Sequence, residues 1–550
     1  MGKIKVAYLS MEIGIDPSIH TYAGGLGILA GDTLKTLSER GIPAVGLTLL
    51  YRKGYLKQRL VERKELQEED PWDTSQLREL KPRISVSIGG KEVRVRAFEK
   101  DLSGRATVPV IFLDTSLDEN PEEFRDLTDY LYGGVKYPDD RRYRLMQEVV
   151  LGMGGVRMLE ALGYEPEKYH LNESHTALAC LELLSKLGEV EKVRERCIFT
   201  SHTPLPTGHE QFPYQLAEEV LGKLPQQVKE LAGRENLNLT KLALSLSGFT
   251  NAVSRRHRET MEQMFPEHRI EAITNGVHSL TWTSESFKKL FDRYLPGWRD
   301  DPFRLKHATM IPDEEIWRAH ETEKRKLLEF IERKTGVKLH LGIFTLGFAR
   351  RMTVYKRPLL IFRNIPELLK VGSGKLQLVF GGKAYPTDKE GRESIRKILG
   401  LAGKLWGKIG VVYLENYGME EARYLTAGVD LWLSLPERPL EACGTSGMKA
   451  AHNGIPQLGI PDGWWAEGCI EGVTGWSVGE EKVRKMQDAQ DAKALYSKLR
   501  IIIPTFYNRR KWVWIMKQTI AHTASYYNTH RMVQEYYSGP VSEGSLQSYK

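Results

Sequence analysis

The second half of the chain alternates short hydrophobic runs with longer amphipathic segments. Short apolar runs bounded by Gly, Asp or Pro are typical of buried strands, and the segments between the first three have the periodicity of helices. A polar helix is expected before them, at about 313–335, and further helices follow from about 485. This alternation predicts a doubly wound parallel sheet. The expected strands are IFTLGFA, LQLVFGG, GVVYLE and DLWLSLP, which start at about residues 343, 376, 410 and 430.

The first half opens with a β-loop-α-β pattern, the building block of another parallel sheet. A strand at 5–11 precedes the glycine-rich segment 21–32, a helix (TLKTLSERG) and a strand at 42–51. Period-two alternation around a Gly-Gly turn at 84–113 predicts inserted hairpins. The rest of the pattern predicts a helical stretch at 141–162 and strands at 197–203 and 270–278.

At 550 residues the chain is too long for one ordinary core. We therefore expect two Rossmann-like domains, 1–280 with a hairpin-rich insertion and 281–550 with a helical tail. The predicted class is α/β, with a cleft between the domains. Ligands in such folds bind at the carboxyl ends of the strands.

The composition argues against several classes of function. The net charge of +8 mildly favours anionic ligands, but zinc-finger, RNP-like and basic-heptad patterns are absent, so nucleic acid is not an expected partner. No run has the length of a membrane span and the start does not resemble a signal peptide. Four scattered cysteines indicate a reducing compartment. A cytoplasmic soluble enzyme is the expectation.

The stretch GLGILA (25–30) formally fits a dinucleotide fingerprint. Its glycines lie about a dozen residues after the strand, however, and the next strand ends in Tyr-Arg-Lys where an acidic residue is needed. An ordinary tight loop is one alternative. We favour a loop at Gly24 and Gly25 whose N–H groups approach an anion at a helix N-terminus.

A basic cluster, FARRMTVYKRP (348–358), follows a predicted strand. A solvated basic face is the plain interpretation of such a run. Arginine forks and a lysine at a strand's carboxyl edge, however, suit phosphate oxygens. The cluster contains Arg350, Arg351, Lys356 and Arg357, and we expect a phosphate or a phosphorylated sugar to bind at this edge.

The segment GTSGMKAA places Lys449 just inside a predicted helix start, where the helix dipole disfavours a cation. Thr445 and Ser446 are expected to cap that helix and to form an anion site. An electropositive pocket would lower the pKa of the lysine amine and favour a Schiff base. The alternative is an exposed lysine on a short helix; the spacing excludes a P-loop.

The histidines His202 and His209 stand seven apart in FTSHTPLPTGHE, with no third ligand at a suitable spacing, which argues against zinc. They favour a structural or substrate-binding role. NESHTAL (172–178) and TNGVH (274–278) lie at further strand-to-loop junctions. No carboxylate pair indicates a glycosidase.

Together these segments resemble the α-glucan phosphorylase family, whose substrates are glycogen, starch or maltodextrin. The matching pieces occur in family order from residue 8 to about 476, and the last is similar to the loop whose lysine holds pyridoxal phosphate. They are YLSMEIG, AGGLGILAGD, TLLYRKGY, YHLNESHTAL, FTSHTPLPTGH, ITNGVH, ARRMTVYKR, YLENY and LEACGTSGMKAAHNG with the following IPQLGIPDGWWAEG.

The resemblance implies a GT-B fold and the reversible phosphorolysis of terminal α-1,4-linked glucose to α-D-glucose 1-phosphate, with retention. It implies pyridoxal 5'-phosphate as a Schiff base on Lys449, with the cofactor's 5'-phosphate serving in proton transfer. The implied partners are an α-1,4-glucan or maltooligosaccharide and inorganic phosphate or glucose 1-phosphate. A homodimer is a family expectation, and no metal is expected.

The resemblance also implies residue roles. The cofactor phosphate would be held by Thr445, Ser446 and Arg350, with Tyr417 near the cofactor ring. Arg351 and Lys356 would clamp the substrate phosphate under the Gly24-Gly25 loop. The main-chain carbonyl of His202 would face the anomeric carbon. The residues implied to bind the glucosyl unit are His202, Asn275, Tyr355, Glu441 and Gly444.

Some positions depart from the family pattern. Cys443 stands where serine is usual, Ser446-Gly447 replaces Gly-Asn, and Gly418 replaces an arginine. The chain starts almost at the first motif, so we expect no N-terminal regulatory segment and no allosteric control. The nearest rival is a GT-B transferase that uses a nucleotide-sugar, such as glycogen synthase, which needs no cofactor lysine. A non-catalytic glucan-binding protein is a third alternative.

Overall fold

The computed structural model describes residues 3–62, 64–480 and 487–537. Within these ranges the chain divides into two compact units. Unit 1 contains residues 3–57, 68–273 and 533–537, and unit 2 contains the rest of the described residues, 58–67 and 274–532. The chain thus passes from unit 1 to unit 2 between Ile273 and Thr274, earlier than the predicted position after residue 280. The hairpin residues 58–67 belong to unit 2, although the chain on both sides of them lies in unit 1. Residues 533–537, at the end of the last described helix, belong to unit 1, although they follow unit 2 in the sequence.

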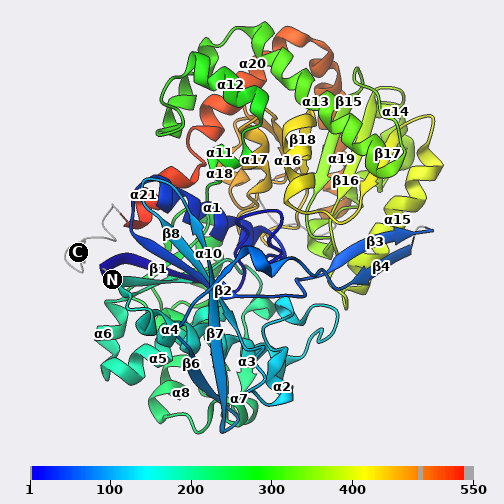
Figure 1. Cartoon of the computed structure of the whole chain (residues 1–550). Coiled ribbons are helices and arrows are strands. Elements are labelled where there is room, and N and C mark those ends of the chain that lie inside the picture. The colour runs from blue at the N-terminus through cyan, green and yellow to red at the C-terminus, as the bar shows by residue number, and fades with distance from the viewer. Residues whose placement is uncertain (1–2, 63, 481–486, 538–550) are drawn as a thin grey trace. The chain divides into compact units, whose positions relative to one another are not determined.

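Unit 1 is built on a largely parallel sheet with β1 (Lys3–Ser10) inside it (Figure 1). The strand order is β14-β13-β10-β9-β1-β2-β8-β7-β5, and β6 pairs with β7. As the period-two pattern predicted, β6 runs antiparallel to β7, which runs antiparallel to β8. The short β5, outside the predicted range, also runs antiparallel to β7. The other strands are β2 Ala44–Leu49, β5 Arg78–Glu79, β6 Ile84–Ile88, β7 Lys91–Leu102, β8 Val108–Asp114, β9 Glu165–Asn172, β10 Cys197–Thr200, β11 Gln211–Pro213, β12 Asn236–Asn238, β13 Phe249–Ala252 and β14 Glu271–Ala272.

The helices of unit 1 differ from the sequence prediction at one functional place. Helix α1 begins at Gly25, inside the segment predicted to be a loop. The predicted helix at 141–162 is α3 and α4, joined by a π-helical segment at Val150–Gly154. The helices are α1 Gly25–Glu39, α2 Glu122–Arg125, α3 Arg141–Val149, α4 Gly155–Ala161, α5 Leu178–Leu187, α6 Val190–Arg194, α7 Tyr214–Leu221, α8 Gln226–Ala232, α9 Leu239–Ser245 and α10 Arg255–Met264.

Unit 2 is built on a parallel sheet in the order β17-β16-β15-β18-β19-β20. Its first four strands in the sequence lie where the hydrophobic runs predicted them, and β19 and β20 were not predicted. The hairpin of β3 (Lys57–Val61) and β4 (Lys64–Glu68) contacts this unit at Asn416, whose side chain accepts the N–H of Gln58, and at Ala384, whose carbonyl accepts Nε2 of Gln67. The sheet strands are β15 Phe344–Ala349, β16 Leu376–Gly381, β17 Gly410–Leu414, β18 Leu431–Ser434, β19 Gln457–Gly459 and β20 Gly475–Ser477.

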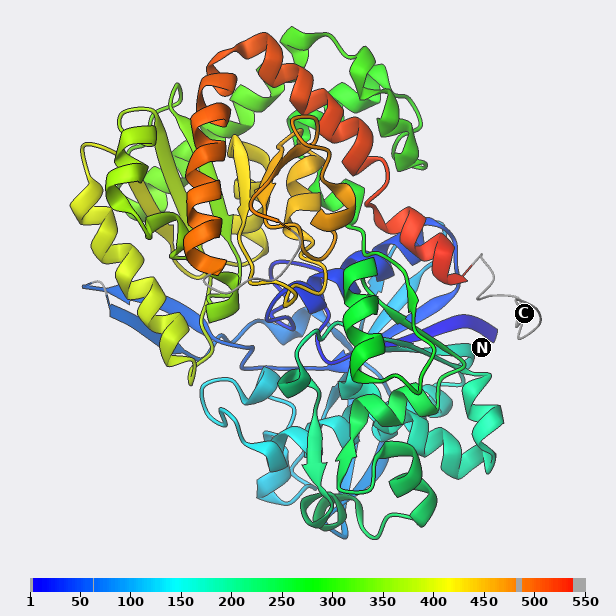
Figure 2. The ribbon, with the colours of Figure 1, turned by 180° about the vertical axis from the view of Figure 1, so that it is seen from behind.

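Helices cover both faces of the unit 2 sheet, as a doubly wound fold requires. One face packs on α13, α16 and α17. The other packs on α14, α15, α19 and α20, and Figure 2 shows α19 alongside the strands. The helices are α11 Ser279–Trp282, α12 Glu285–Tyr294, α13 Asp313–Thr335, α14 Ile365–Gly372, α15 Lys389–Leu405, α16 Met419–Gly428, α17 Ser446–Ala451, α18 Trp465–Gly468, α19 Gln487–Tyr507, α20 Arg509–Thr519 and α21 Thr529–Tyr537. In the described ranges, none of the helices combines the length and apolarity needed to cross a membrane.

The last turn of α21 completes a buried polar core in unit 1. The hydroxyl of Tyr537 lies 2.6 Å from Nδ1 of His170, whose Nε2 lies 2.8 Å from Oγ1 of Thr200. The hydroxyl of Tyr536 accepts a hydrogen bond from Nδ2 of Asn251 at 2.8 Å. Side chains on β9, β10 and β13 therefore obtain part of their hydrogen bonding from the end of α21.

Candidate active site

Lys449 lies in α17, which follows the loop after β18 in unit 2. It occupies the last turn of this six-residue helix, not its first turn as the sequence predicted. The helix dipole does not disfavour a cation at that end, so its position is not anomalous. The Lys449 side chain is buried, and its Nζ lies 4.0 Å from the centroid of the Trp282 ring.

The predicted capping of this helix is wrong. Thr445 is the N-cap residue, but its side chain makes no capping hydrogen bond; its carbonyl accepts the N–H groups of Met448 and Lys449. The hydroxyl of Ser446 accepts a hydrogen bond from Nε1 of Trp432 at 3.0 Å. A helix this short adds little dipole, so any anion here must be held mainly by side chains.

Two positions in the loop around Lys449 require glycine, one because of close packing and one because of its backbone conformation. A Cβ atom on Gly447 would overlap Oε1 of Gln457 and lie 2.9 Å from the Trp464 ring. Gly444 has a φ of +84° and packs against the Glu441 side chain. Among the described residues, Oε1 of Gln457 and Oδ1 of Asn275 are buried acceptors that have no hydrogen-bond partner. Buried acceptors of this kind are normally completed by a donor from water or a ligand.

The basic cluster at the end of β15 converges on one carboxylate. Nζ of Lys356 donates to both oxygens of Glu441, at 2.7 and 2.6 Å, and Nη1 of Arg350 lies 3.0 Å from Oε2. Burial alone would raise the pKa of Glu441, but Arg350 and then Lys356 lower it below its ordinary value. Lys356 is buried and Arg351 is exposed. A solvated basic face therefore describes Arg351 but not Lys356.

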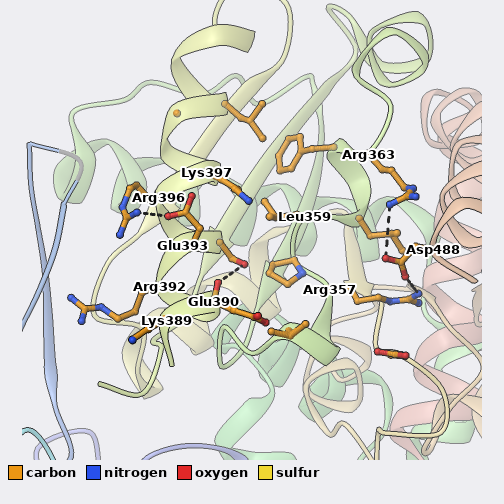
Figure 3. Close-up of a pocket in the computed structure, with 18 of the residues that line it drawn as sticks. Arg357, Leu359, Arg363, Lys389, Glu390, Arg392, Glu393, Arg396, Lys397 and Asp488 are labelled. Carbon is orange, nitrogen blue, oxygen red and sulfur yellow. Dashed lines mark hydrogen bonds and ion pairs between the residues drawn. The ribbon is translucent and has the colours of Figure 1, made fainter. Parts of the chain in front are cut away.

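The segment that carries Tyr355 and Lys356 is fixed from its other side by Arg357. This buried arginine donates to the carbonyls of Leu435 and Pro436 and pairs with Asp488 at 2.9 Å. Figure 3 shows Arg357 and Arg363 both directed at Asp488, beside a pocket of about 1290 Å³ between this segment and α15. The carbonyl of Tyr355 also accepts the N–H of Glu437 at 2.6 Å. The position of Lys356 is thus set by its backbone as well as by Glu441.

Asp462 holds the backbone of Glu441 in place. Its carboxylate accepts the backbone N–H of Glu441 at 2.9 Å and that of Gly463 at 3.0 Å. Burial raises the pKa of Asp462 to about 7, and the charge of Glu441 adds to the increase against the effect of the backbone hydrogen bonds. Asp462 is therefore a carboxyl group that titrates near neutral pH inside this cluster.

Two other predicted residues of unit 2 lie at strand ends or beside them. The Tyr417 ring packs against Gly381, the last residue of β16. The carbonyl of Asn275 accepts a hydrogen bond from Nη2 of Arg531 at 3.1 Å. Tyr417 is therefore placed by packing against a strand end, and Asn275 by a hydrogen bond from a side chain.

His202 lies in unit 1, directly after β10. Thr200 and Asn172 are register neighbours at the ends of β10 and β9, and Oδ1 of Asn172 lies 2.7 Å from Nε2 of His202. Since that oxygen only accepts, Nε2 carries the proton. Glu173 accepts the N–H of His202 at 2.7 Å and the hydroxyl of Thr203 at 2.9 Å. Burial lowers the pKa of His202 to about 3, so the ring is neutral at physiological pH.

Gly24 and Gly25 also lie in unit 1, at the start of α1. The N–H of Gly24 donates to the Glu12 carboxylate at 3.0 Å, so it is used inside the protein. Nothing lies within 4 Å of the place where a Gly25 side chain would begin. The N–H groups of the first turn of a helix have no carbonyl partner within that helix, and the donors at Gly25 and Leu26 are of this kind.

Unit 2 thus contains most of the predicted site residues, and several of them meet around Glu441. Sequence reasoning missed Trp282 and Asp462 in unit 2, and Asn172 and Glu173 in unit 1. The quoted motifs IPDGWW and NESH contained three of these four residues. Trp282 follows TNGVH by only a few positions, but nothing in its local pattern pointed to Lys449.

Two family models match the chain. The carbohydrate phosphorylase family matches residues 226–471, and the starch synthase catalytic domain matches residues 5–275. The first match includes the Lys449 loop and the basic cluster. The second lies mainly in unit 1 and agrees with its α/β sheet.

Curated relatives match nearly the whole chain. The maltodextrin phosphorylase of Thermococcus litoralis is 40% identical over 96% of this chain and 70% of its own length. The glycogen phosphorylase of Aquifex aeolicus is 34% identical over 97% of this chain and 85% of its own length. The glycogen phosphorylase of Mycobacterium tuberculosis is 31% identical over 98% and 71%. These matches do not favour a transferase that uses a nucleotide-sugar.

The α/β fold, the family and the enzymatic nature predicted from the motifs are therefore confirmed. The chain belongs to the glycogen and maltodextrin phosphorylase family, and it is a glycosyl-transferring enzyme.

Proposed function

We propose that this glucan phosphorylase cleaves the terminal α-1,4-linked glucose of a maltodextrin or glycogen chain with inorganic phosphate. The product is α-D-glucose 1-phosphate, formed reversibly and with retention, and the cofactor is pyridoxal 5'-phosphate on Lys449. The observation that carries the proposal is the buried meeting of Arg350 and Lys356 on Glu441, in the same unit as the buried Lys449. A homodimer stays a prediction.

The residues around Lys449 suit this cofactor. The buried amine stands over the Trp282 ring, and Gly447 allows close approach to the loop. The unpartnered acceptors of Gln457 and Asn275 suit ligand donors. Lys449 would hold the cofactor covalently, while Arg350, Thr445 and Ser446 would hold its phosphate. The aromatic side of the site would include Tyr417.

The bound cofactor would supply a phosphate group that exchanges a proton with the substrate phosphate. Two phosphates close together repel, and a basic cluster is the physical remedy. In this role Arg351 and Lys356 would bind the substrate phosphate. Arg351 is exposed and accessible to an incoming anion, whereas Lys356 is held in place by Glu441.

The glucosyl unit would be bound by neutral and negative groups. Glu441 stays ionised because its pKa is lowered by Arg350 and Lys356, so it accepts hydrogen bonds from sugar hydroxyls. His202 is neutral, so it adds no repulsion to positive charge that develops at the anomeric carbon. Its main-chain carbonyl would face that charge. Asn275, Tyr355 and Gly444 are the other proposed sugar contacts.

The test joins a chemical and a kinetic measurement. Borohydride reduction of the purified protein and peptide mapping should give a pyridoxyl adduct on the peptide that contains Lys449. The variant Lys449→Ala should lose the adduct and the phosphate-dependent release of glucose 1-phosphate from maltodextrin. The exposed Lys404 on α15 gives the matched control, because Lys404→Ala should keep both. An adduct on another lysine, or an active Lys449→Ala variant, would contradict the proposal.

A further inference from the structure

Glu12 is a buried carboxylate directly beneath the glycine loop, after the end of β1. One of its oxygens, Oε2, accepts the N–H of Ala23 at 2.6 Å and that of Gly24 at 3.0 Å. Hydrogen bonds between backbone N–H groups and a carboxylate are strong ones. The backbone that leads into α1 is therefore fixed by a side chain from a different segment.

The other oxygen of Glu12 is held by Tyr132, whose hydroxyl donates to Oε1 at 2.7 Å. Burial, and then the charge of Glu12, raise the pKa of Tyr132 well above its ordinary value, so the hydroxyl keeps its proton. Tyr132 has a φ of 56°, which is unusual for a residue with a bulky side chain. Strain of this kind persists only where the surroundings determine the conformation, and it is concentrated at functional sites.

Arg144 fixes Tyr132 in turn. Its guanidinium lies 4.2 Å from the centroid of the Tyr132 ring, and its Nε donates to Glu210 at 2.7 Å. The buried Glu148 lies 3.4 Å from the same Nε. Burial and the charge of Glu210 raise the pKa of Glu148 well above its ordinary value. Burial also acts to raise the pKa of Glu210, but Arg144 and the hydrogen bond from Glu148 together lower it below its ordinary value. Glu148 is thus the protonated member of the pair, and Glu210 is the anion that holds Arg144.

Glu210 ends the loop that begins after β10 and carries His202. Glu12, Tyr132, Arg144 and Glu210, here called the loop anchor, therefore connect the glycine loop to the loop of His202 through unbroken contacts. All four side chains belong to unit 1. Their sequence positions are far apart, so the connection exists only in the folded protein.

We infer that Glu12 and Tyr132 are positioning residues for phosphate binding, because they hold the glycine loop in place through the loop anchor. This inference rests on the proposed function for the role of the Gly24-Gly25 loop. With Gly24 bonded to Glu12, the free N–H groups that face a phosphate are those of Gly25 and Leu26. Loosening the anchor at its Glu12–Tyr132 contact misplaces these donors and weakens phosphate binding more than glucan binding, because the contact of Arg144 with Glu210 at the His202 loop stays intact.

The experiment compares two tyrosines that each donate a hydroxyl to a carboxylate. Tyr132→Phe removes the bond to Glu12, and Tyr137→Phe removes a bond of the same length, 2.7 Å, to Asp126 elsewhere in unit 1. A hydrogen bond to a charged group is worth about tenfold or more in binding. We expect Tyr132→Phe to raise the KM for phosphate about tenfold with little change in the KM for maltodextrin. Tyr137→Phe should change neither. Hydrogen exchange at Ala23 and Gly24 should be faster in Tyr132→Phe only.

The variant Glu12→Gln provides a second line, since it keeps an acceptor oxygen but removes the charge. It should also raise the KM for phosphate, and its effect should not add to that of Tyr132→Phe. Unchanged kinetics and exchange in Tyr132→Phe would overturn the inference. So would a lower KM for phosphate in Glu12→Gln, because Glu12 would then compete with the anion. Should the wild-type protein lack phosphate-dependent activity, the proposed function fails, and hydrogen exchange still decides whether the anchor holds the loop.

Discussion

The ammonium group of Lys356 lies 2.7 and 2.6 Å from the two oxygens of the Glu441 carboxylate, and both residues are buried. Arg350 reaches the same carboxylate at 3.0 Å. One anion therefore balances two cations, and a positive charge is left over in a low-dielectric place. A further bound anion would neutralise this positive charge. The stability of the cluster therefore depends on Glu441 and on bound anions.

Replacing Glu441 by Gln should destabilise the protein strongly. The buried Lys356 and the half-buried Arg350 then lose their counter-ion, and loss of one partner of a buried pair costs about 3–5 kcal/mol. Thermal denaturation should show a lower midpoint for Glu441→Gln, and added sulfate should raise it more than in the wild type, because the anion supplies the missing charge. The exposed Glu437 gives a control, and Glu437→Gln should leave the midpoint unchanged. Equal responses to sulfate in the two variants would speak against this account.

Asp462 should make stability depend on pH near neutrality. Its pKa in the folded protein, about 7, is raised above the ordinary value, so the folded state holds an extra proton between about pH 4 and pH 7. That stabilisation is fully present below about pH 4 and is lost as the pH rises through about 7. An asparagine does not titrate, so the stability of Asp462→Asn does not fall in this way as the pH rises. The difference in thermal midpoint between wild type and variant should therefore shift in favour of the variant from about pH 5 to pH 8. Parallel curves would show that Asp462 does not titrate in this range.

Gly447 and Gly400 should respond oppositely to alanine. At Gly447 the new Cβ would overlap Gln457, and overpacking of this kind costs about 1–3 kcal/mol. We expect Gly447→Ala to lower both the thermal midpoint and the content of bound pyridoxal. Gly400 lies within α15 with nothing within 4 Å of its missing side chain, so Gly400→Ala should stabilise by about 0.5–1 kcal/mol. An unchanged thermal midpoint in Gly447→Ala would refute the tight packing of this loop, and a normal cofactor content would contradict the proposed position of the cofactor beside it.

Five histidines of unit 1, three buried and two half-buried, should make the protein acid-sensitive. Burial is the main cause that lowers their pKa, so the unfolded chain binds protons below about pH 6.5 that the folded chain does not. Their stabilising effect is present above that pH and is lost as the pH falls toward the folded values. Each such group contributes about 1.4 kcal/mol per pH unit in the intervening range. The pKa is lowered to about 3 for His170, His175 and His202 and to about 4 for His209 and His257.

The direct measurement is proton uptake on denaturation by urea at about pH 5. The wild type should take up several protons, and His257→Gln about one fewer, because a glutamine can still bond the Thr203 carbonyl but does not titrate. His307, which is exposed, gives the control, since His307→Gln should leave proton uptake on unfolding unchanged. An unchanged uptake in His257→Gln would mean that this histidine is already protonated in the folded state.

The fold could be predicted where hydrophobic runs were long enough to be read. β15, β16, β17 and β18 lie at the predicted runs, and α13 has the predicted bounds, 313–335. β19 and β20 span only three residues each, among glycines and tryptophans, and give no periodic signal. The start of α1 was misplaced because glycines have low helix propensity. Tertiary hydrogen bonds to Glu12 set that helix start instead.

The chemistry of the site could be predicted better than its connections. Lys449, Arg350 and Lys356 were identified from residue type and position after strands, and their functional roles stay predictions. The partners of these residues come from distant segments: Trp282 lies beside Lys449, and Asp462 bonds the backbone of Glu441. Such pairs leave no local pattern, because each residue is ordinary in its own segment. Only the folded chain reveals them.

The return of α21 to unit 1 has a consequence for biosynthesis. A ribosome releases the N-terminal sheet long before Tyr536 and Tyr537 are made, so His170, Thr200 and Asn251 emerge without their hydroxyl partners. Unit 1 therefore cannot complete its core during translation in the order of the sequence. The hydrogen bonds of this core to Tyr536 and Tyr537 can form only after unit 2 has been synthesised.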